Sequence, residues 1–590
     1  MLRRKFCVIL CVLPLALAGP LSHEQEDATV AGKGKEWWQT ASFYQIYPRS
    51  FKDSDTDGIG DLQGITEKMH HLKDIGITAT WLSPIFKSPM KDFGYDISDF
   101  KTIQEEYGTM EDFENMIKKA KELGIKIILD FVPNHTSDEH EWFQKSINKE
   151  PGYENVYVWH PGKKGLNPYR NDPPNNWLSV FRGSAWEWNE KRKEYYLHQF
   201  AKGQPDLNYR NPKVKEMMAD VLKFWLQKGV YGFRIDAVPH VFECVGMPDE
   251  PRNNDVKDPE DWSFLQHTCT VDQPETIEMV YEWREIMDKF TQESEDKVPR
   301  IMMTEAYSSL DTLKKYYVSP DGKRQGAQIP FNFLLITELN GNSKAKDFQN
   351  VVEKWMKIVP EGKSANWVLG NHDQHRVATR YGVQKADVMN MILLSLPGAG
   401  VNYNGEEIAM TNVDISWEDT KDPAGCNAGK ENYAKSSRDP ERTPFQWSAE
   451  KNAGFSRGDK TWLPVAKNYT EVNVVKQEGI PRSTLNVYKQ MQKLRKRAAF
   501  TDGGYEVKAL SDDILAVVRT IGEKNSEAYL TLVNLGNAEG SVNVGSLKHL
   551  ADSLKYEILT ANSPHNAGDE TKTDIKMMPY EGVVLSCRVP

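Results

Sequence analysis

Apolar residues in the first part of the chain alternate between helical spacing and short continuous runs. Three segments with helical spacing each end at a glycine and lead into a short apolar run: 65–75 before 78–82, 110–123 before 126–130, and 214–228 before 231–238. Glycine terminates helices well because its backbone adopts the left-handed conformation without steric penalty. Successive helix–glycine–strand units predict parallel βαβ architecture.

Further apolar runs complete a set of strands that is typical of a barrel. They lie at 43–47, 301–304, 329–335, 367–369 and 401–403, and 485–497 is expected to form the last helix. Eight strands alternating with helices are the pattern of a (β/α)8 barrel. The predicted fold class is therefore α/β, with a TIM barrel formed by residues 37–134 and 204–500.

Two segments depart from this alternation. Residues 135–203, after the third strand, are irregular and dense in Pro, Asn and Trp. A loop of this length in a compact protein is usually functional or a small domain of its own, so we expect an inserted domain. Residues 501–590 show alternating strands separated by Gly and Asn turns, which predict a C-terminal antiparallel β domain.

The N-terminal segment has the features of a secretory signal. Arg3, Arg4 and Lys5 precede an apolar run at 6–18 that is too short to span a bilayer, and it ends in a small-residue cleavage signature. We expect a cleaved signal peptide at 1–18, with an uncleaved anchor as the alternative, followed by a polar spacer at 19–36. The C-terminal sequence lacks the apolar tail of a lipid-anchor signal. The expected location is extracellular, without a membrane span or lipid anchor.

The charge of the chain bears on its partners, and its cysteines bear on disulfide formation. The net charge is −10 and no basic stripe is present, which disfavours a nucleic-acid partner. Four cysteines would remain after cleavage and could pair in three ways. Pairing of Cys244 with Cys269 closes a short loop and is the expected disulfide, while the state of Cys426 and Cys587 stays open.

Acidic residues follow the ends of three predicted strands. Arg234 and Asp236 lie two apart in the run 231–238 and should share one face of a strand. This pair could be a structural ion pair, or Asp236 could be a nucleophile kept ionised by the guanidinium. Glu305 and Asp373 follow two further strands, and residues at that end of barrel strands are typically catalytic. The functional interpretation is therefore favoured.

The residue types fit cleavage of a glycosidic bond by two carboxylates. Asp236, beside a cation, is expected to have a lowered pKa and to attack the anomeric carbon. Glu305, facing other carboxylates, is expected to have a raised pKa and to protonate the leaving oxygen. Asp373 would stabilise the positive charge of the transition state. This chemistry requires no organic cofactor.

Five short motifs make the chain resemble the α-amylase family of glycoside hydrolases (family 13). They are DFVPNH at 130–135, QPDLN at 204–208, GFRID at 232–236, TEAY at 304–307 and NHD at 371–373. The second has the form found in the α-glucosidase and oligo-1,6-glucosidase branch, and the chain is most similar to secreted insect maltases. The resemblance implies a retaining mechanism with Asp236 as nucleophile, Glu305 as acid/base and Asp373 as stabiliser, and it implies that the insert is domain B.

The resemblance also implies a sugar-binding set around the non-reducing glucose. Its members are Asp92, Tyr95, His135, Arg234, His372 and Arg442. Asp92 and Arg442 are expected to close the pocket together, which would make the enzyme exo-acting. In this branch a small residue after the nucleophile is associated with α-1,4 bonds, so Ala237 favours maltose-like and sucrose-like substrates. Alternatively, Ala237 is small only for packing inside the barrel.

An acidic loop after the first strand resembles the first part of a calcium-binding loop. The sequence DSDTDGIGD places oxygen ligands at alternate positions and a glycine at the sixth, so the expected ligands are Asp53, Asp55, Asp57, Ile59 (through its carbonyl) and Asp61. Gly64 replaces the usual bidentate Glu. We expect a structural Ca²⁺, with Mg²⁺ or a solvated acidic turn as the alternatives. A glycosylation sequon at Asn468 is expected to be used, whereas the one at Asn134 is expected to stay unmodified.

The hypothesis with most support is a secreted, exo-acting, retaining α-glucosidase that acts on small α-1,4 glucosides, with sucrose as a candidate second substrate. A transglucosidase, or an α-1,6- or sucrose-preferring member, is the nearest alternative. A non-catalytic binding or receptor member is the alternative from another class, disfavoured because all three carboxylates are present. The sequence leaves the oligomeric state open.

Overall fold

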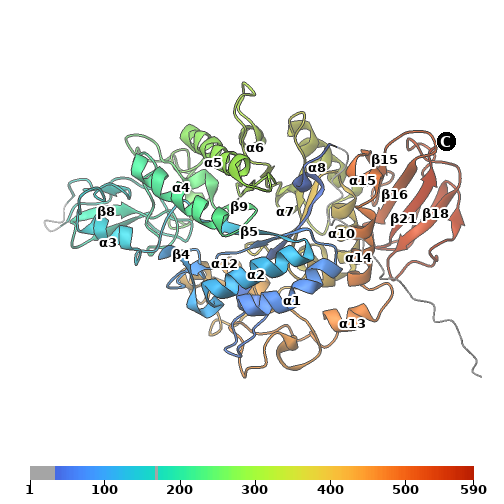
Figure 1. Ribbon diagram of the computed structural model, residues 1–590, viewed down its shortest axis with the longest axis horizontal. Coiled ribbons are helices and arrows are strands. Elements are labelled where there is room, and N and C mark those ends of the chain that lie inside the picture. The colour runs from blue at the N-terminus through green and yellow to red at the C-terminus, as the bar shows by residue number, and fades with distance from the viewer. Residues whose placement is uncertain (1–33, 166–169) are drawn as a thin grey trace, which may run out of the picture.

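The computed structural model describes residues 34–165 and 170–590, and a parallel barrel lies at its centre (Figure 1). The strands of the barrel are β1 Ser42–Ile46, β2 Ala79–Leu82, β5 Lys126–Phe131, β9 Gly232–Ile235, β10 Ile301–Thr304, β11 Ile329–Pro330, β12 Asn366–Val368 and β13 Ala399–Tyr403. They pair in parallel in the order β11-β10-β9-β5-β2-β1-β13-β12. The predicted fold is confirmed.

Side chains join the two strands at the ends of this order. Asn366 on β12 donates from Nδ2 to Pro330 O at 2.6 Å and accepts from the Asn332 N–H at 2.9 Å. The prediction of a strand over 329–335 was wrong in its second half. Pro330 has no N–H for a ladder, and the chain turns into the short helix α7 Leu334–Thr337, where Asn332 Oδ1 accepts from the Leu334 N–H at 3.1 Å.

Helices pack around the outside of the barrel. They are α1 Leu62–Asp74, α2 Met110–Leu123, α4 Pro212–Gln227, α5 Pro274–Glu293, α6 Leu310–Tyr317, α8 Ala345–Ile358, α9 Val377–Tyr381, α10 Ala386–Ser395, α14 Thr484–Leu494 and α15 Ala498–Thr501. Helix α2 illustrates how the sequence sets the boundaries: Thr109 and Asp112 form a reciprocal capping box at its start, and Gly124 ends it at φ 71°.

Successive side chains of each barrel strand point alternately into the barrel and outward toward the helices. On β9, Phe233 and Ile235 belong to the apolar cluster between strands and helices, whereas Arg234 points to the opposite face. The interior is filled by a second cluster that includes Phe43, Trp81 and Met303. The interior is thus a packed core, and the charged residues lie where the strands end.

Two β regions lie at opposite ends of the long axis of the molecule, with the barrel between them (Figure 1). The insert after β5 contains α3 Glu141–Ile147 and the antiparallel strands β6 Trp159–His160, β7 Trp186–Asn189 and β8 Glu194–Leu197. A short hairpin of β3 Phe86–Lys87 and β4 Asp99–Ile103 precedes α2.

The C-terminal region forms an antiparallel sheet in the order β14-β15-β16-β21-β18-β19 and a separate β17-β20 pair. Its strands are β14 Gly504–Ala509, β15 Ile514–Thr520, β16 Glu527–Asn534, β17 Gly540–Asn543, β18 Leu554–Leu559, β19 Glu570–Thr571, β20 Asp574–Met577 and β21 Gly582–Arg588. The predicted antiparallel C-terminal domain is confirmed.

A long excursion between β13 and α14 returns to the carboxyl ends of the strands. It carries α11 Pro423–Ala428, α12 Tyr433–Ser436 and α13 Val474–Glu478, together with Arg438 and Arg442. This region was expected to belong to the barrel, and its sequence did not indicate that it would bring two arginines to the site.

The predicted disulfide between Cys244 and Cys269 is present, and Cys426 and Cys587 are free. The predicted signal peptide and most of the spacer lie outside the described residues. Within the described ranges, no helix is both long and apolar enough to cross a bilayer.

Candidate active site

The carboxyl end of β9 places a buried cation among three carboxylates. Arg234 Nη1 donates to Asp236 Oδ1 at 2.5 Å and to the two oxygens of Asp130 at 2.9 and 3.0 Å. Nη2 of the same guanidinium lies 2.9 Å from Glu305 Oε2. Asp130 lies near the end of β5, and Asp236 and Glu305 directly follow β9 and β10, which are neighbouring strands. The structure therefore brings the predicted nucleophile and the predicted acid/base to one point.

A backbone contact fixes the orientation of Glu305. The Ala237 N–H donates to Glu305 Oε2 at 2.9 Å, and the Val238 N–H donates to the Glu305 carbonyl at 3.3 Å. Ala237 adopts a left-handed conformation with φ 45°. A β-branched residue is strained at positive φ, so the turn after the nucleophile favours a small side chain.

Burial governs the protonation of the two central carboxylates. It raises the pKa of Asp236 and of Glu305 to about 7, although the Arg234 guanidinium opposes the rise in each. The raised pKa expected for Glu305 is confirmed. The lowered pKa expected for Asp236 was wrong, because one guanidinium is shared among several buried carboxylates. Near neutral pH the two groups titrate as a pair that holds about one proton.

Asp373 has the opposite electrostatic environment. Its Oδ1 accepts from Arg442 Nη2 at 2.8 Å and from Arg438 Nη1 at 3.1 Å, and its Oδ2 lies 3.4 Å from His372 Nε2. Burial opposes ionisation here too, but the guanidinium groups of Arg438 and Arg442 outweigh it and hold the pKa of Asp373 below its usual range. Asp373 is therefore an anion at neutral pH.

A chain of hydrogen bonds connects the predicted sugar-binding residues to one another. Burial holds the pKa of His372 well below its usual range, so the ring is neutral. Gln45 Nε2 donates to His372 Nδ1 at 2.8 Å, which leaves the proton on Nε2 facing Tyr95 Oη at 2.8 Å. The Tyr95 hydroxyl in turn donates to Asp130 Oδ2 at 3.0 Å. The chain ends on the carboxylate that Arg234 binds, so these groups hold one another in a fixed geometry.

His135 is held by a second network, which involves residues of the QPDLN motif. His135 Nε2 donates to the Tyr95 carbonyl at 3.0 Å, and burial lowers the pKa of His135 to about 4. Gln204 Nε2 lies 3.2 Å from the same ring nitrogen and donates to Asp92 Oδ2 at 3.0 Å. Asn134 donates to Asp206 Oδ1 at 3.3 Å. The QPDLN motif thus supports the wall of the site that carries Asp92.

The expected pairing of Asp92 with Arg442 is not what the structure contains. Asp92 Oδ1 accepts from Arg438 Nη2 at 3.0 Å, and Arg438 also bonds Asp422, whose nearest oxygen lies 2.6 Å from Nη2. Arg442 lies behind Asp373, with its Nε donating to the His372 carbonyl at 2.9 Å. Arg438 and Arg442 lie four residues apart, and the sequence alone did not indicate which of the two would contact Asp92.

A cavity of about 570 Å³ opens over these groups. Its lining includes seven of the predicted residues: Asp92, Tyr95, His135, Asp236, Glu305, His372 and Asp373. Sequence reasoning missed Arg438, Phe181 and Arg182 from the insert, Trp262 from the loop after β9, and Tyr307, which is 47% exposed. Most of these lie on irregular loops that carry no periodic signal, although Tyr307 lies only two residues beyond Glu305.

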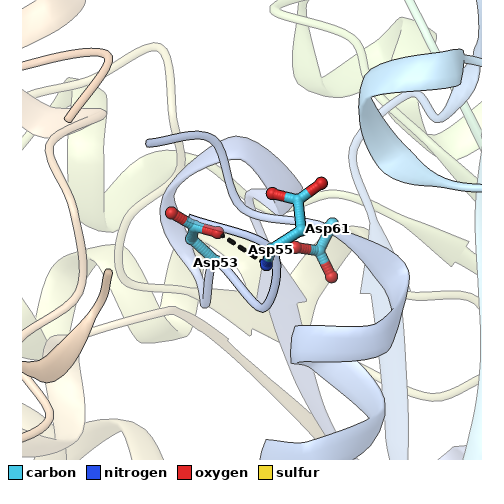
Figure 2. Close-up of side chains that lie close together, drawn as sticks. All are labelled: Asp53, Asp55 and Asp61. Atoms are coloured by element: carbon cyan, nitrogen blue, oxygen red, sulfur yellow. Dashed lines mark hydrogen bonds between the residues drawn. The ribbon is translucent and has the colours of Figure 1, made fainter. Parts of the chain in front are cut away.

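The acidic loop after β1 brings three of its predicted ligands together (Figure 2). One carboxylate oxygen each from Asp53, Asp55 and Asp61 lies within 4.8 Å of the others. Asp57 is not part of this group, and its Oδ1 accepts from the Ile59 N–H at 2.7 Å. Gly58 adopts φ 92°, as the sharp turn of such a loop requires. Converging hard oxygen donors fit a divalent cation, although the set is smaller than predicted.

The two glycosylation sequons differ in their surroundings. Asn134 is 1% exposed, which agrees with the expectation that it stays unmodified. Asn468 is partly buried, and its Oδ1 accepts from Gln446 Nε2 at 3.1 Å. Modification of Asn468 stays a prediction.

Comparison with known proteins is consistent with this geometry. The family model for the α-amylase catalytic domain matches residues 45–503. Maltase A1 of Drosophila melanogaster is 52% identical over 93% of this chain and 96% of its own length, and the salivary alpha-glucosidase of Anopheles gambiae is 50% identical over 93% of each. A human amino acid transporter heavy chain is 37% identical over 91% of this chain and 76% of its own. The crystal structure of the alpha-glucosyl transfer enzyme XgtA superposes with a TM-score of 0.81 at 31% identity, covering 94% of this chain and all of that one.

Proposed function

Because the chain belongs to the α-amylase family, we propose that it is an exo-acting, retaining α-glucosidase that releases glucose from the non-reducing end of maltose-like substrates. The relatives named maltase and alpha-glucosidase, at about half identity over nearly the whole chain, support this activity. The observation that carries the proposal is the meeting of Asp236, Glu305 and Asp373 in one cavity, where Arg234 binds the first two.

The roles in the reaction follow from the family, and the protonation of the pair is compatible with them. A pair that holds about one proton at neutral pH provides one carboxylate and one carboxylic acid. Asp236 attacks the anomeric carbon while Glu305 gives its proton to the leaving oxygen. Glu305 then removes a proton from water as the covalent intermediate is hydrolysed. Asp373 remains ionised and stabilises positive charge on the ring.

The Asp92–Arg438 pair supports exo action. Both side chains line the cavity and bond each other across one of its walls. Their polar atoms would bind the hydroxyls of a terminal glucose, and a chain extended beyond that glucose would have to displace the buried pair. Breaking such a pair by removing one partner is strongly destabilising, so internal bonds of starch should be poor substrates.

The residue after the nucleophile supports α-1,4 preference. Ala237 lines the cavity beside Glu305, and its left-handed conformation does not suit a β-branched side chain. Sucrose is a second expected substrate. The similarity to a glucosyl transfer enzyme makes transfer to a sugar acceptor the alternative reaction of the same site. A non-catalytic role, suggested by the transporter heavy chain, is disfavoured by the intact carboxylate cluster.

A structural Ca²⁺ in the acidic loop is part of the proposal. Asp53, Asp55 and Asp61 would supply its carboxylate ligands. The ion would neutralise a turn that lies between β1 and α1, and it takes no part in bond cleavage. Secretion after signal cleavage is also proposed, and a disulfide between Cys244 and Cys269 supports an oxidising compartment. A glycan on Asn468 would be compatible with that location.

Product analysis on maltose, isomaltose, sucrose and starch tests the proposal. We expect fast release of glucose from maltose, initially as the α-anomer by NMR, slow release from starch, and no turnover by Asp236→Asn. Initial release of β-glucose would contradict retention. Rapid loss of starch viscosity would contradict exo action, and full activity of Asp236→Asn would remove the assigned nucleophile.

A further inference from the structure

The carboxylate of Asp422 lies behind the Asp92–Arg438 pair and is fully buried. Asp92, Asp373 and Arg438 line the cavity, and Asp422 is not among the lining residues. Asp422 Oδ1 accepts from Arg438 Nε at 3.1 Å and from Nη2 at 2.6 Å. One edge of the guanidinium is therefore bound behind the pocket, while Nη1 and the second N–H of Nη2 donate to Asp373 and Asp92.

The same carboxylate also binds the backbone of Arg438. Asp422 Oδ2 accepts from the Arg438 N–H at 2.8 Å, although the two residues are 16 positions apart. Asp439 makes the reciprocal contact, since its Oδ2 accepts from the Asp422 N–H at 3.0 Å. Close packing completes the junction: a Cβ at Gly425 would lie 2.8 Å from the Cβ of Ser437. These contacts join the two ends of the intervening segment.

Residues 422–438, which contain α11 and α12, thus form a loop that is closed at its base, and we call this segment the tied loop. Ala424 lines the cavity. On the outer side of the loop, Asn427 Nδ2 donates to the Phe181 carbonyl of the insert at 3.0 Å. The ring of Phe181 also lies against the Arg438 guanidinium, with its centroid 5.0 Å from Cζ. The insert therefore holds the tied loop and covers one face of its cation.

Three carboxylates share the Arg438 guanidinium, and they differ in exposure. The side chain of Asp422 is 0% exposed, that of Asp92 is 5% exposed and that of Asp373 is 23% exposed. Burial opposes the ionisation of Asp422, but the guanidinium groups of Arg438 and Arg442 outweigh it and hold the pKa of Asp422 below its usual range. A buried anion is costly without its cation. Asp422 therefore keeps its edge of the guanidinium bound while ligands exchange at the other edge.

We propose that Asp422 is a positioning residue that orients Arg438 toward the hydroxyls of the terminal glucose. Two contacts along one edge fix the plane of a guanidinium as well as its place. Nη1 and Nη2 of Arg438 are therefore oriented before substrate arrives, and less conformational entropy is lost on binding. Asp422 does not touch the sugar and acts only through Arg438. This inference rests on the proposed α-glucosidase activity and identifies what sets the geometry of its glucose pocket.

Substitution of Asp422 by asparagine tests this role, because it keeps the shape of the side chain and removes its charge. A hydrogen bond to a charged group contributes about ten-fold or more in binding. Asp422→Asn should lower kcat/KM on maltose about ten-fold and raise the Kd of free glucose, measured by calorimetry, by a similar factor. Asp419→Asn is the matched control in the same region. Asp419 is exposed and its Oδ2 accepts from Ser416 Oγ at 2.8 Å, so both quantities should stay unchanged.

A second background separates positioning from general support of the fold. In Arg438→Lys the single side-chain nitrogen stays with Asp422, so the contacts that Asp422 orients are already lost. Adding Asp422→Asn should then leave kcat/KM within about two-fold of the value for Arg438→Lys alone. A carboxylate that only stabilised the tied loop would lower kcat/KM by the same factor in both backgrounds. Equal losses in the two backgrounds would overturn the proposal.

Urea unfolding shows whether each assayed variant is folded. Asp422→Ser is the second variant if Asp422→Asn yields no folded protein, because its hydroxyl still offers an uncharged acceptor to the tied loop. An unchanged glucose Kd in the folded variant would overturn the positioning role and leave the α-glucosidase assignment intact. A wild-type protein that does not cleave maltose would remove that assignment, whereas glucose binding, which needs no turnover, would still test Asp422.

Discussion

Substitution of Arg438 by lysine tests the corrected assignment of the glucose-binding pair. The guanidinium group of Arg438 contacts three carboxylates. Its Nη2 donates to Asp92 Oδ1 at 3.0 Å and to Asp422 Oδ1 at 2.6 Å, and its Nη1 donates to Asp373 Oδ1 at 3.1 Å. A lysine has one nitrogen and cannot reproduce this arrangement. If that nitrogen stays with the buried Asp422, the contacts to Asp92 and Asp373 are lost.

The size of the effect follows from those contacts. A hydrogen bond to a charged group contributes about 1.5–3 kcal/mol. Two such losses at groups that would hold the terminal glucose should lower kcat/KM on maltose by about 100-fold or more. Part of the cost will also appear as a lower unfolding free energy in urea, because Asp92 would be left buried without a cation.

A double-mutant cycle separates the two candidate arginines. Asp92→Asn combined with Arg438→Lys should give a coupling energy of about 1.5 kcal/mol or more in kcat/KM, whereas Asp92→Asn combined with Arg442→Lys should be additive within about 0.5 kcal/mol. Arg442→Lys is the matched control, because it also removes a guanidinium from Asp373 but leaves the Asp92 contact. Stronger coupling of Asp92 to Arg442 than to Arg438 would refute the reasoning.

Three further predictions concern the acid, a buried carboxylate and the proposed metal. Glu305→Gln should lose activity on maltose by several orders of magnitude but retain formation of the covalent intermediate from α-glucosyl fluoride, seen as a burst of fluoride; equal loss on both would contradict its role as acid. Burial raises the pKa of Glu406 to about 7, above the value of the unfolded chain, so the folded state binds the extra proton and wild-type stability should fall as pH rises from about 4.5 to 7, by up to about 3 kcal/mol. Urea unfolding of Glu406→Gln should be less pH-dependent over this window, and parallel curves for the two proteins would exclude the effect. Ca²⁺ at 100 times its Kd should stabilise the protein by about 2.7 kcal/mol, and Asp55→Asn should weaken this response; an unfolding temperature insensitive to both Ca²⁺ and chelator would remove the proposed ion.

The sequence predicted the barrel because its elements carry their own boundary signals. Gly124 follows α2 in the left-handed conformation, and the apolar run before it has the period of a helix. The strand predicted over 329–335 failed where tertiary structure decided the outcome. Pro330 cannot donate to a ladder, and Asn332 Oδ1 accepts from the Leu334 N–H at the first residue of α7. Apolar residues alone do not distinguish a buried strand from a short buried helix.

The candidate site was predictable to the extent that its residues lie on strands. Asp236, Glu305 and Asp373 were located by their position after apolar runs, and the parallel barrel brings them together. Trp262 and Arg438 lie on long irregular segments, where no period relates sequence position to a place in the cavity. Their location depends on the disulfide-closed loop after β9 and on the excursion after β13, neither of which a local pattern encodes.

The order of the strands explains why the carboxylates of the site differ in pKa. β5, β9 and β10 are neighbours, so their three carboxylates share the single cation Arg234, and burial keeps the pKa of Asp236 and Glu305 high. Asp373 follows β12, next to β13, and the excursion after β13 brings the guanidinium groups of Arg438 and Arg442 to it. One side of the cavity therefore retains a mobile proton near neutral pH while the other retains a fixed negative charge. A glycosidase needs both at the same anomeric carbon. They are provided because Asp236 and Glu305 share one arginine, whereas Asp373 contacts two others.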